Sequence, residues 1–204
     1  SQDMSFKPGA RERDACAIIA FVDKRGRQTH ANIVKTIEAL KKMAHRSGGI
    51  NDEGDGCGIM TDIPRDLWGR RLETKGMSRH LAESRGFFVG HFMLPFSIRS
   101  GSAKMLERIR DVLSARNMEL LVEIGGNTRD EGLGPRAQAE PPLFWQVGGM
   151  ASETDPRAAN KALFDVQLEL EAKFEELHIA SLSLDSTVYK LRGSPDLLNR
   201  VYTE

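Results

Sequence analysis

The sequence predicts an α+β protein in which helices and strands are mixed rather than strictly alternating. About seven short apolar segments have the length and the residue types of strands, and four or five longer segments repeat apolar residues at helical spacing. Several of the predicted strands come in adjacent pairs with no helix between them. This order favours α+β layers over a parallel, doubly wound sheet.

The composition narrows the classes of function. Lys plus Arg and Asp plus Glu number 29 each in 204 residues, so the charge balance does not indicate binding to nucleic acid or to an anionic membrane. No apolar run reaches the roughly 18 residues of a membrane span. Two cysteines make no disulfide framework, and with five histidines they show no zinc spacing, so we expect a cytoplasmic protein without a metal site.

The first third of the chain begins with a polar leader. Residues 1–15 are rich in charge and are expected to form an exposed arm rather than core. Residues 17–22 read as a buried strand that ends at a polar turn over residues 23–26. A helix follows, with Asn32 as its cap, and the glycines at 48 and 49 end it. Residues 51–56 are expected to form a loop.

The remaining elements follow from hydrophobic spacing and from turn residues. Residues 65–81 are expected to be helical and loop material, and residues 125–142 a loop. Strands are predicted over residues 57–61, 87–94, 120–124, 143–147, 179–183 and 187–191, the last two forming a pair joined by a short turn. Helices are predicted over residues 102–116, 158–177 and 195–202.

Cys16 stands at the mouth of the first predicted strand. One interpretation is a small buried core residue, which is how free cysteine is often used. The other is a nucleophile, which needs a nearby base or a lowered pKa. Cleavage between Ala15 and Cys16 would free an α-amino group with a pKa near 8, and that amine can take the thiol proton.

Two further stretches are candidates for a site. His45 and Arg46 lie where the first helix ends, so they either complement the helix dipole or direct an arginine at an anionic substrate group. Gly54, Asp55 and Gly56 belong to a glycine-rich loop, typical of close backbone approach to a strand or a ligand. A degraded calcium loop is the weaker interpretation, because its first and last ligand positions carry the wrong residues.

Taken together, the motifs resemble the class II glutamine amidotransferase domain of glutamate synthase, in the same order along residues 16–204. The early pieces are Cys16-Ala17-Ile18, Lys24 to Gly26, His45-Arg46-Ser47, Gly54-Asp55-Gly56-Cys57-Gly58-Ile59 and Ile63-Pro64. The later pieces are Val89-Gly90 to Leu94-Pro95, Gly132-Leu133-Gly134-Pro135 with Glu140-Pro141, Ser181-Leu182-Ser183 and Thr187-Val188-Tyr189-Lys190.

The resemblance implies an αββα sandwich of the N-terminal-nucleophile type with antiparallel sheets. It also implies hydrolysis of glutamine to glutamate and ammonia, with Cys16 as nucleophile and, through its α-amine, as its own base. Arg46 matches an arginine that lines the active site in this class. FMN, iron–sulfur and NADPH cofactors would belong to a synthase partner, and none is expected in this chain.

The sequence also departs from the family pattern. Ala17 and Ser47 stand where the family has glycine, and Cys57 stands where it has alanine. The family's substrate-clamping arginine segment and its oxyanion Asn-Gly pair follow the last matching strand, and the chain stops at Glu204 before both. We therefore expect a fragment of the domain, a domain completed by a second polypeptide, or, as the alternative function, a non-catalytic glutamine-binding or regulatory module. The edge of the strand over residues 187–191 would be exposed without its continuation, which suggests a partner chain or self-association. A plain structural α+β domain is the third reading.

Overall fold

The computed structural model describes residues 18–27, 29–43, 49–50, 53–54, 57–126, 139 and 142–191. The chain divides into two compact units: residues 1–57 with 191–204 form the first, and residues 58–190 form the second. The predicted exposed arm, the last predicted helix and most of the predicted loop over residues 125–142 lie outside the described residues.

The predicted first strand is wrong for the residues that the structure describes. Residues 18–22 carry no strand, and most of their apolar side chains are exposed: Ile18 is 88% accessible and Val22 80%. An apolar run favours a strand only where a neighbouring strand can pair with it, and residues 18–22 have no such partner in the described part of the chain. The turn after it is confirmed, because Gly26 adopts a positive φ of 64° and its N–H donates to the Asp23 carbonyl.

The predicted helix in the first unit is confirmed with shifted ends. Helix α1 spans His30–Lys42, with Thr29 rather than Asn32 at its N-cap and Met43 at its C-cap. Ile37 is the buried residue of its apolar side. The expected loop over residues 51–56 is partly strand: β1 (Gly49–Ile50) and β2 (Glu53–Gly54) pair antiparallel in a short hairpin.

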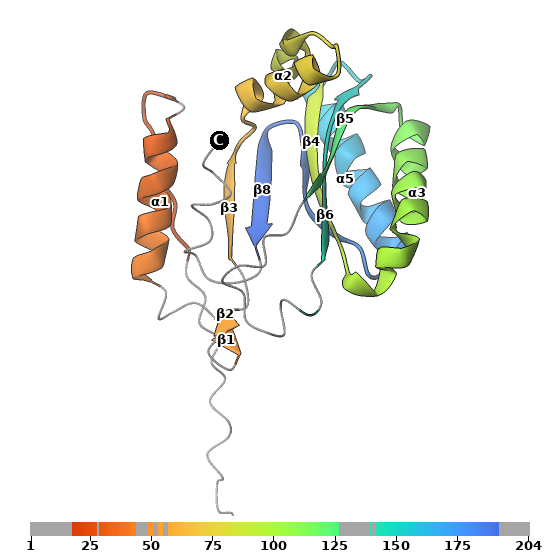
Figure 1. Ribbon diagram of the computed structural model, residues 1–204. Helices are drawn as coiled ribbons and strands as arrows, with labels where there is room; N and C mark the ends of the chain where they lie inside the picture. The colour runs from red at the N-terminus through yellow and green to blue at the C-terminus, as the bar shows by residue number, and fades with distance from the viewer. Residues whose placement is uncertain are drawn as a thin grey trace, which may run out of the picture. The chain divides into compact units, whose positions relative to one another are not determined.

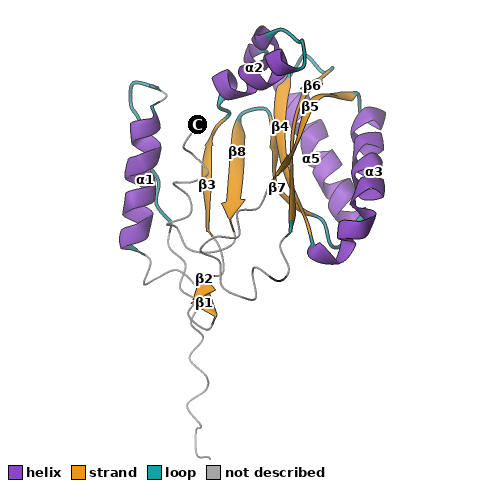
Figure 2. Cartoon of the chain, in the orientation of Figure 1, coloured by secondary structure: helices purple, strands orange, loops and turns teal. Residues whose placement is uncertain are grey.

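A four-stranded antiparallel sheet forms the centre of the second unit. Its order is β5-β6-β4-β7, from strands Met118–Gly126, Leu143–Ala151, Phe87–Leu94 and His178–Ser183 (Figure 2). Strand β4 is paired on both sides, and seven of its eight residues are buried, which explains why its sequence is almost continuously apolar. The bounds predicted for this strand match the structure.

Two helices cover one face of this sheet. Helix α3 spans Ser102–Ala115 and helix α5 spans Pro156–Lys173, and both lie on the side of the sheet away from β3 and β8 (Figure 1). The predicted apolar stripes are confirmed: Ile109 and Leu113 of α3 pack with Leu163 and Leu170 of α5 against the sheet. Helix α5 starts earlier than predicted because Asp155 caps it and Pro156 is its first residue.

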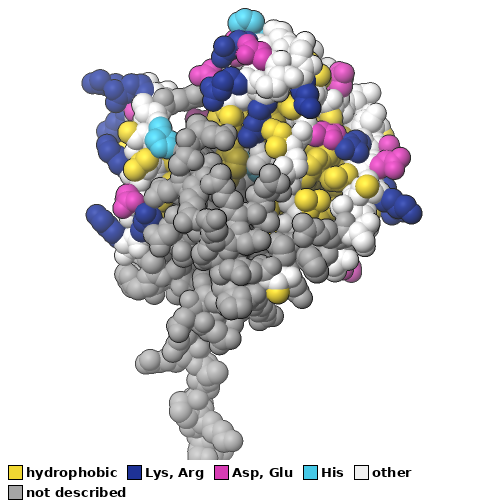
Figure 3. Space-filling model, in the orientation of Figure 1, with side chains coloured by type: hydrophobic (Ala, Val, Ile, Leu, Met, Phe, Trp, Pro, Cys, Tyr) yellow, Lys and Arg dark blue, Asp and Glu magenta, His cyan; other side chains and the backbone are white. Residues whose placement is uncertain are grey.

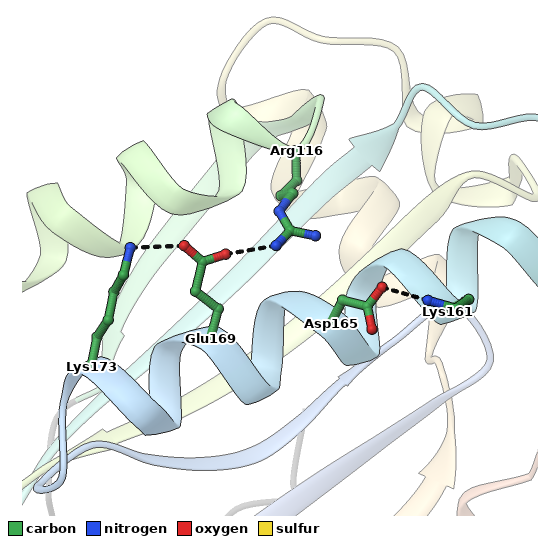
Figure 4. Close-up of polar contacts among 5 residues, drawn as sticks. All are labelled: Arg116, Lys161, Asp165, Glu169 and Lys173. Carbon is green, nitrogen blue, oxygen red and sulfur yellow. Dashed lines mark hydrogen bonds and ion pairs between the residues drawn. The ribbon is translucent and has the colours of Figure 1, made fainter.

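Exposed ion pairs join α3 to α5. Glu169 of α5 accepts from Arg116 at the end of α3 and from Lys173 one turn further along α5 (Figure 4). The Lys173 hydrogen bond is the main cause that lowers the pKa of Glu169. Lys161 and Asp165 form a separate pair on α5, 2.8 Å apart. Exposed pairs of this kind add little stability each.

The other face of the sheet packs on helix α2 (Arg65–Thr74) and on the short 3-10 helix η2 (Arg79–Glu83). Trp68 and Leu72 of α2 and Phe87 and Val89 of β4 form this second core. A further 3-10 helix, η3 (Phe96–Gly101), precedes α3. Strands β3 (Cys57–Asp62) and β8 (Ser186–Leu191) form a two-stranded sheet on the α2 side (Figure 1).

The prediction that the strands over residues 179–183 and 187–191 pair with each other is wrong. The two strands exist, but β7 pairs with β4 while β8 pairs with β3 in the other sheet. The chain crosses between sheets at a tight corner, where the Ser183 hydroxyl accepts from the N–H groups of Asp185 and Ser186. Leu184 is buried at this corner, 2% exposed, so the core holds the crossing in place.

Arg65 of α2 forms hydrogen bonds to the backbone at the same corner. Its guanidinium donates to the carbonyls of Leu184, Ala82 and Ser84 at distances of 3.1, 2.7 and 3.3 Å. Hydrogen bonds from a charged donor are stronger than neutral ones, so this contact holds α2, η2 and the crossing together. The expected α+β class with antiparallel sheets and helix layers is confirmed.

The described surface carries charges of both signs. On the face shown in Figure 3, the side chains of Lys and Arg and those of Asp and Glu are intermixed. Within the described residues, none of the helices is both long enough and apolar enough to cross a membrane.

Candidate functional site

Four of the five predicted site residues lie outside the described residues. These are Cys16, Arg46, Asp55 and Gly56. Gly54 is described in β2, where it pairs with Gly49 of β1. By residue number all five belong to the first unit. Their roles and mutual distances stay predictions.

The second cysteine has the properties of an inert thiol. Cys57 begins β3 and is half-buried, and burial raises the pKa of its thiol to about 11. The thiolate is the reactive form of cysteine, so at neutral pH very little of Cys57 can attack a substrate. Cys57 is therefore the natural control residue in any test of Cys16.

The second unit contains a group of buried and half-buried polar side chains that the sequence did not predict to be a site. We call it the inter-sheet polar cluster, because it lies where α2, β4, β6 and β8 meet. Its members are Trp68, Arg71, His91, Gln146, Thr187 and Tyr189. The His91 ring meets the Tyr189 ring edge-on, with centroids 4.4 Å apart. Arg71 donates to Gln146 Oε1 at 3.0 Å, and its guanidinium carbon lies 4.6 Å from the centroid of Trp68.

Burial governs the protonation of this cluster. The pKa of His91 is lowered to about 4, mainly by burial and then by the charge of Arg71. Burial is also the largest influence on Tyr189 and raises its pKa, while Arg71, Thr187 and Trp68 act in the opposite direction. At neutral pH both His91 and Tyr189 are uncharged. A signal for His91 in the sequence would have been a lone histidine inside an apolar strand.

Acid should therefore weaken the fold through His91. Its pKa is depressed in the folded state and ordinary, about 6.5, in the unfolded state. The unfolded state thus binds more protons between those values, and stability is lost as the pH falls from about 6.5 towards 4. We expect the free energy of unfolding to fall by about 2 kcal/mol more between pH 7 and pH 5 in the wild type than in His91→Gln.

Urea unfolding of both proteins at the two pH values measures this difference. His80→Gln is the matched control for the loss of a histidine, because His80 is exposed on η2. Equal pH dependence in the wild type and His91→Gln would contradict a neutral, buried His91.

Several motif pieces in the second unit have packing roles in the structure. A Cβ atom at Gly90 would lie 2.8 Å from the Phe92 ring and 2.9 Å from a Val147 methyl, so a side chain there would force these buried neighbours to shift. Thr187 is fully buried, and the Ser181 hydroxyl accepts from the Val188 N–H at 2.9 Å. These motif residues therefore stabilise the fold of the second unit through packing and hydrogen bonding. No group of three or more metal-ligating side chains occurs in the part of the chain that the structure describes.

Most of the chain matches a known protein family. A family-wide sequence model of class II glutamine amidotransferases matches residues 16–204. The match begins at Cys16, the residue singled out as the nucleophile.

The similar curated proteins are glutamate synthases. The chain is 29% identical over 204 residues to a ferredoxin-dependent glutamate synthase of Pyropia yezoensis, covering 95% of this chain and 13% of that protein. It is 26% identical over 202 residues to the glutamate synthase [NADPH] large chain of Bacillus subtilis, covering 95% of this chain and 13% of that one. A chloroplastic ferredoxin-dependent glutamate synthase of Spinacia oleracea is 46% identical over 67 residues. The chain thus spans about an eighth of the first two relatives.

Proposed function

Because the chain belongs to the class II glutamine amidotransferases, as the motifs indicated, we propose that it hydrolyses glutamine to glutamate and ammonia in a protein of the glutamate synthase type. The observation that carries this proposal is the start of the family match at Cys16. The likeness to glutamate synthases over 95% of the chain supports the same context.

In the proposed reaction Cys16 is both nucleophile and, through its α-amine, general base. Removal of residues 1–15 frees the amine, which takes the thiol proton at a pKa near 8. The thiolate forms a bond to the side-chain carbonyl carbon of glutamine, the carbon–nitrogen bond breaks, and the departing nitrogen leaves as ammonia after receiving a proton. Water then adds to the glutamyl thioester, releasing glutamate and restoring the thiol.

The other predicted site residues take supporting roles in this proposal. Arg46 pairs with an anionic group of glutamine, because a guanidinium binds a carboxylate through two parallel hydrogen bonds. The backbone of residues 54–56 approaches the substrate closely, since Gly54 and Gly56 carry no side chain. Asp55 serves as a hydrogen-bond acceptor in that loop.

The wider context is part of the same proposal. The ammonia passes to a synthase partner or to further parts of a synthase, and the FMN, iron–sulfur and NADPH cofactors belong there. A cytoplasmic location and a homo-oligomer stay predictions. The alternative function is that of a non-catalytic glutamine-binding or regulatory module. The experiment below distinguishes this alternative from an enzyme.

Covalent labelling of protein purified from its native host tests the proposal. We expect an intact mass that begins at Cys16 and gains one adduct from a glutamine-mimicking diazoketone alkylator. The adduct should persist in Cys57→Ala, whose thiol is held protonated, and be lost in Cys16→Ala. An intact mass that retains residues 1–15, with no adduct, would overturn the enzymatic proposal in favour of the binding module.

A further inference from the structure

Three buried polar atoms in the inter-sheet polar cluster have no hydrogen-bond partner. They are Trp68 Nε1, His91 Nε2 and Thr187 Oγ1. Trp68 and Thr187 are fully buried, and His91 is 7% exposed. A buried polar atom without a partner costs about 1–3 kcal/mol, so three in one place call for a shared explanation.

These atoms come together around a single tyrosine. The Tyr189 ring contacts His91 edge-on, and side-chain hydrogen bonding with Thr187 and Trp68 acts to lower the pKa of Tyr189, although neither contact has full hydrogen-bond geometry. The three side chains also come from three different elements, α2, β4 and β8. The three atoms also make no hydrogen bond to one another.

The apolar surroundings exclude bulk water from these atoms. Phe87 and Val89 of β4 and Ile63 beyond β3 are 0–1% exposed and belong to the same core as Trp68. The ring of Trp68 lies so close to Gly148 that a Cβ atom there would be 2.9 Å from Trp68 Cε3. The packing therefore favours a very small molecule that can both donate and accept hydrogen bonds.

We propose that the cluster binds one structural water molecule, held by Trp68 Nε1, His91 Nε2 and Thr187 Oγ1. Its oxygen accepts from the Trp68 indole N–H. Its two hydrogens and its remaining lone pair serve His91 and Thr187, each of which can donate or accept. Buried waters typically make about three hydrogen bonds to polar groups that otherwise lack a partner, which is the number of atoms here.

The proposed water has a structural consequence for β8. Strand β4 pairs through its backbone with β6 and β7, and β8 pairs with β3. A water held by all three atoms adds a polar link from β8 to β4 and α2, beside the ring contact of Tyr189. This inference concerns the second unit alone and does not depend on the proposed glutamine chemistry.

High-resolution crystal structures of the chain and of two Thr187 variants test the inference. In the wild type we expect density for one isolated water within about 3.2 Å of all three atoms. Thr187→Val keeps the shape of the side chain but removes its hydroxyl, so the water should lose occupancy or disappear. Thr187→Ser keeps the hydroxyl and should keep the water.

Three results would overturn the proposal. One is a direct hydrogen bond from Trp68 Nε1 to the Tyr189 hydroxyl with no water density beside it. Another is density for an organic molecule or an ion in place of water. The third is a water of unchanged occupancy in Thr187→Val. If Thr187→Val does not fold, the wild-type and Thr187→Ser structures still decide between these results.

Discussion

Replacing Cys16 by alanine is expected to lower glutamine hydrolysis by at least about 10³-fold, because the substitution removes the atom that forms the covalent intermediate. The loss should appear in kcat, since binding of the glutamine ground state does not need the thiol. Ammonia release at saturating glutamine, measured on the protein freed of residues 1–15, gives this rate.

Two variants make this result specific. Cys57→Ala should keep nearly full activity, because burial holds the Cys57 thiol protonated, with a pKa of about 11. Cys16→Ser preserves the size of the side chain, so loss of activity in both Cys16 variants with a normal far-ultraviolet spectrum separates chemistry from misfolding. Activity above a tenth of wild type in Cys16→Ala would mean that another group is the nucleophile.

A methyl group added at Gly149 is expected to destabilise the second unit by about 3 kcal/mol. Gly149 lies in β6 between β4 and β5, and a Cβ atom there would meet the Glu119 carbonyl oxygen and the Phe88 ring. The Cε1 atom of Phe88 would be 2.7 Å away. The Glu119 oxygen is backbone in a paired strand and cannot turn aside, so the sheet itself must shift.

Gly125→Ala is the matched control for Gly149→Ala. Gly125 lies in the neighbouring strand β5, is exposed, and has nothing within 4 Å of the added methyl group. The free energy of unfolding of the Gly125→Ala variant should stay within about 0.5 kcal/mol of the wild-type value or rise slightly. Urea unfolding can be followed by tryptophan fluorescence, since both tryptophans, Trp68 and Trp145, lie in the second unit. Equal stability of the two variants would contradict the close packing at Gly149.

Sequence spacing predicted best the elements whose own residues define them, whatever packs against them. The stripe Ile109, Val112 and Leu113 makes a helix amphipathic whatever lies beneath it, and these three residues are buried. Strand β4 was predicted over its true bounds because an almost continuously apolar run of eight residues ends at Pro95. The helix over residues 158–177 was predicted too far towards its end, because Phe174 has left the helical conformation while Leu177 still faces the core.

The errors came where pairing or burial depends on distant residues. Residues 18–22 have the composition of a strand, but the ladder that makes a strand must come from elsewhere. Strands β7 and β8 are adjacent in sequence, yet they belong to different sheets, because the chain turns between them at the buried residue Leu184. Secondary-structure propensity depends on a residue and its close neighbours in sequence. It therefore could not predict the absence of a strand over residues 18–22 or the separation of β7 and β8 into two sheets.

The sequence by itself determined the family and the α+β class, because ordered motifs and local periodicity are properties of the chain. The place of the nucleophile at Cys16 stays a prediction from the same motifs. Only the tertiary structure decided which strands pair, why a side chain at Gly149 would clash with the backbone of the neighbouring strand, and that His91 stays neutral beside Tyr189. Strand pairing, steric clash and desolvation each depend on groups brought together from distant parts of the sequence. The inter-sheet polar cluster, assembled from residues 68 to 189, is the clearest case.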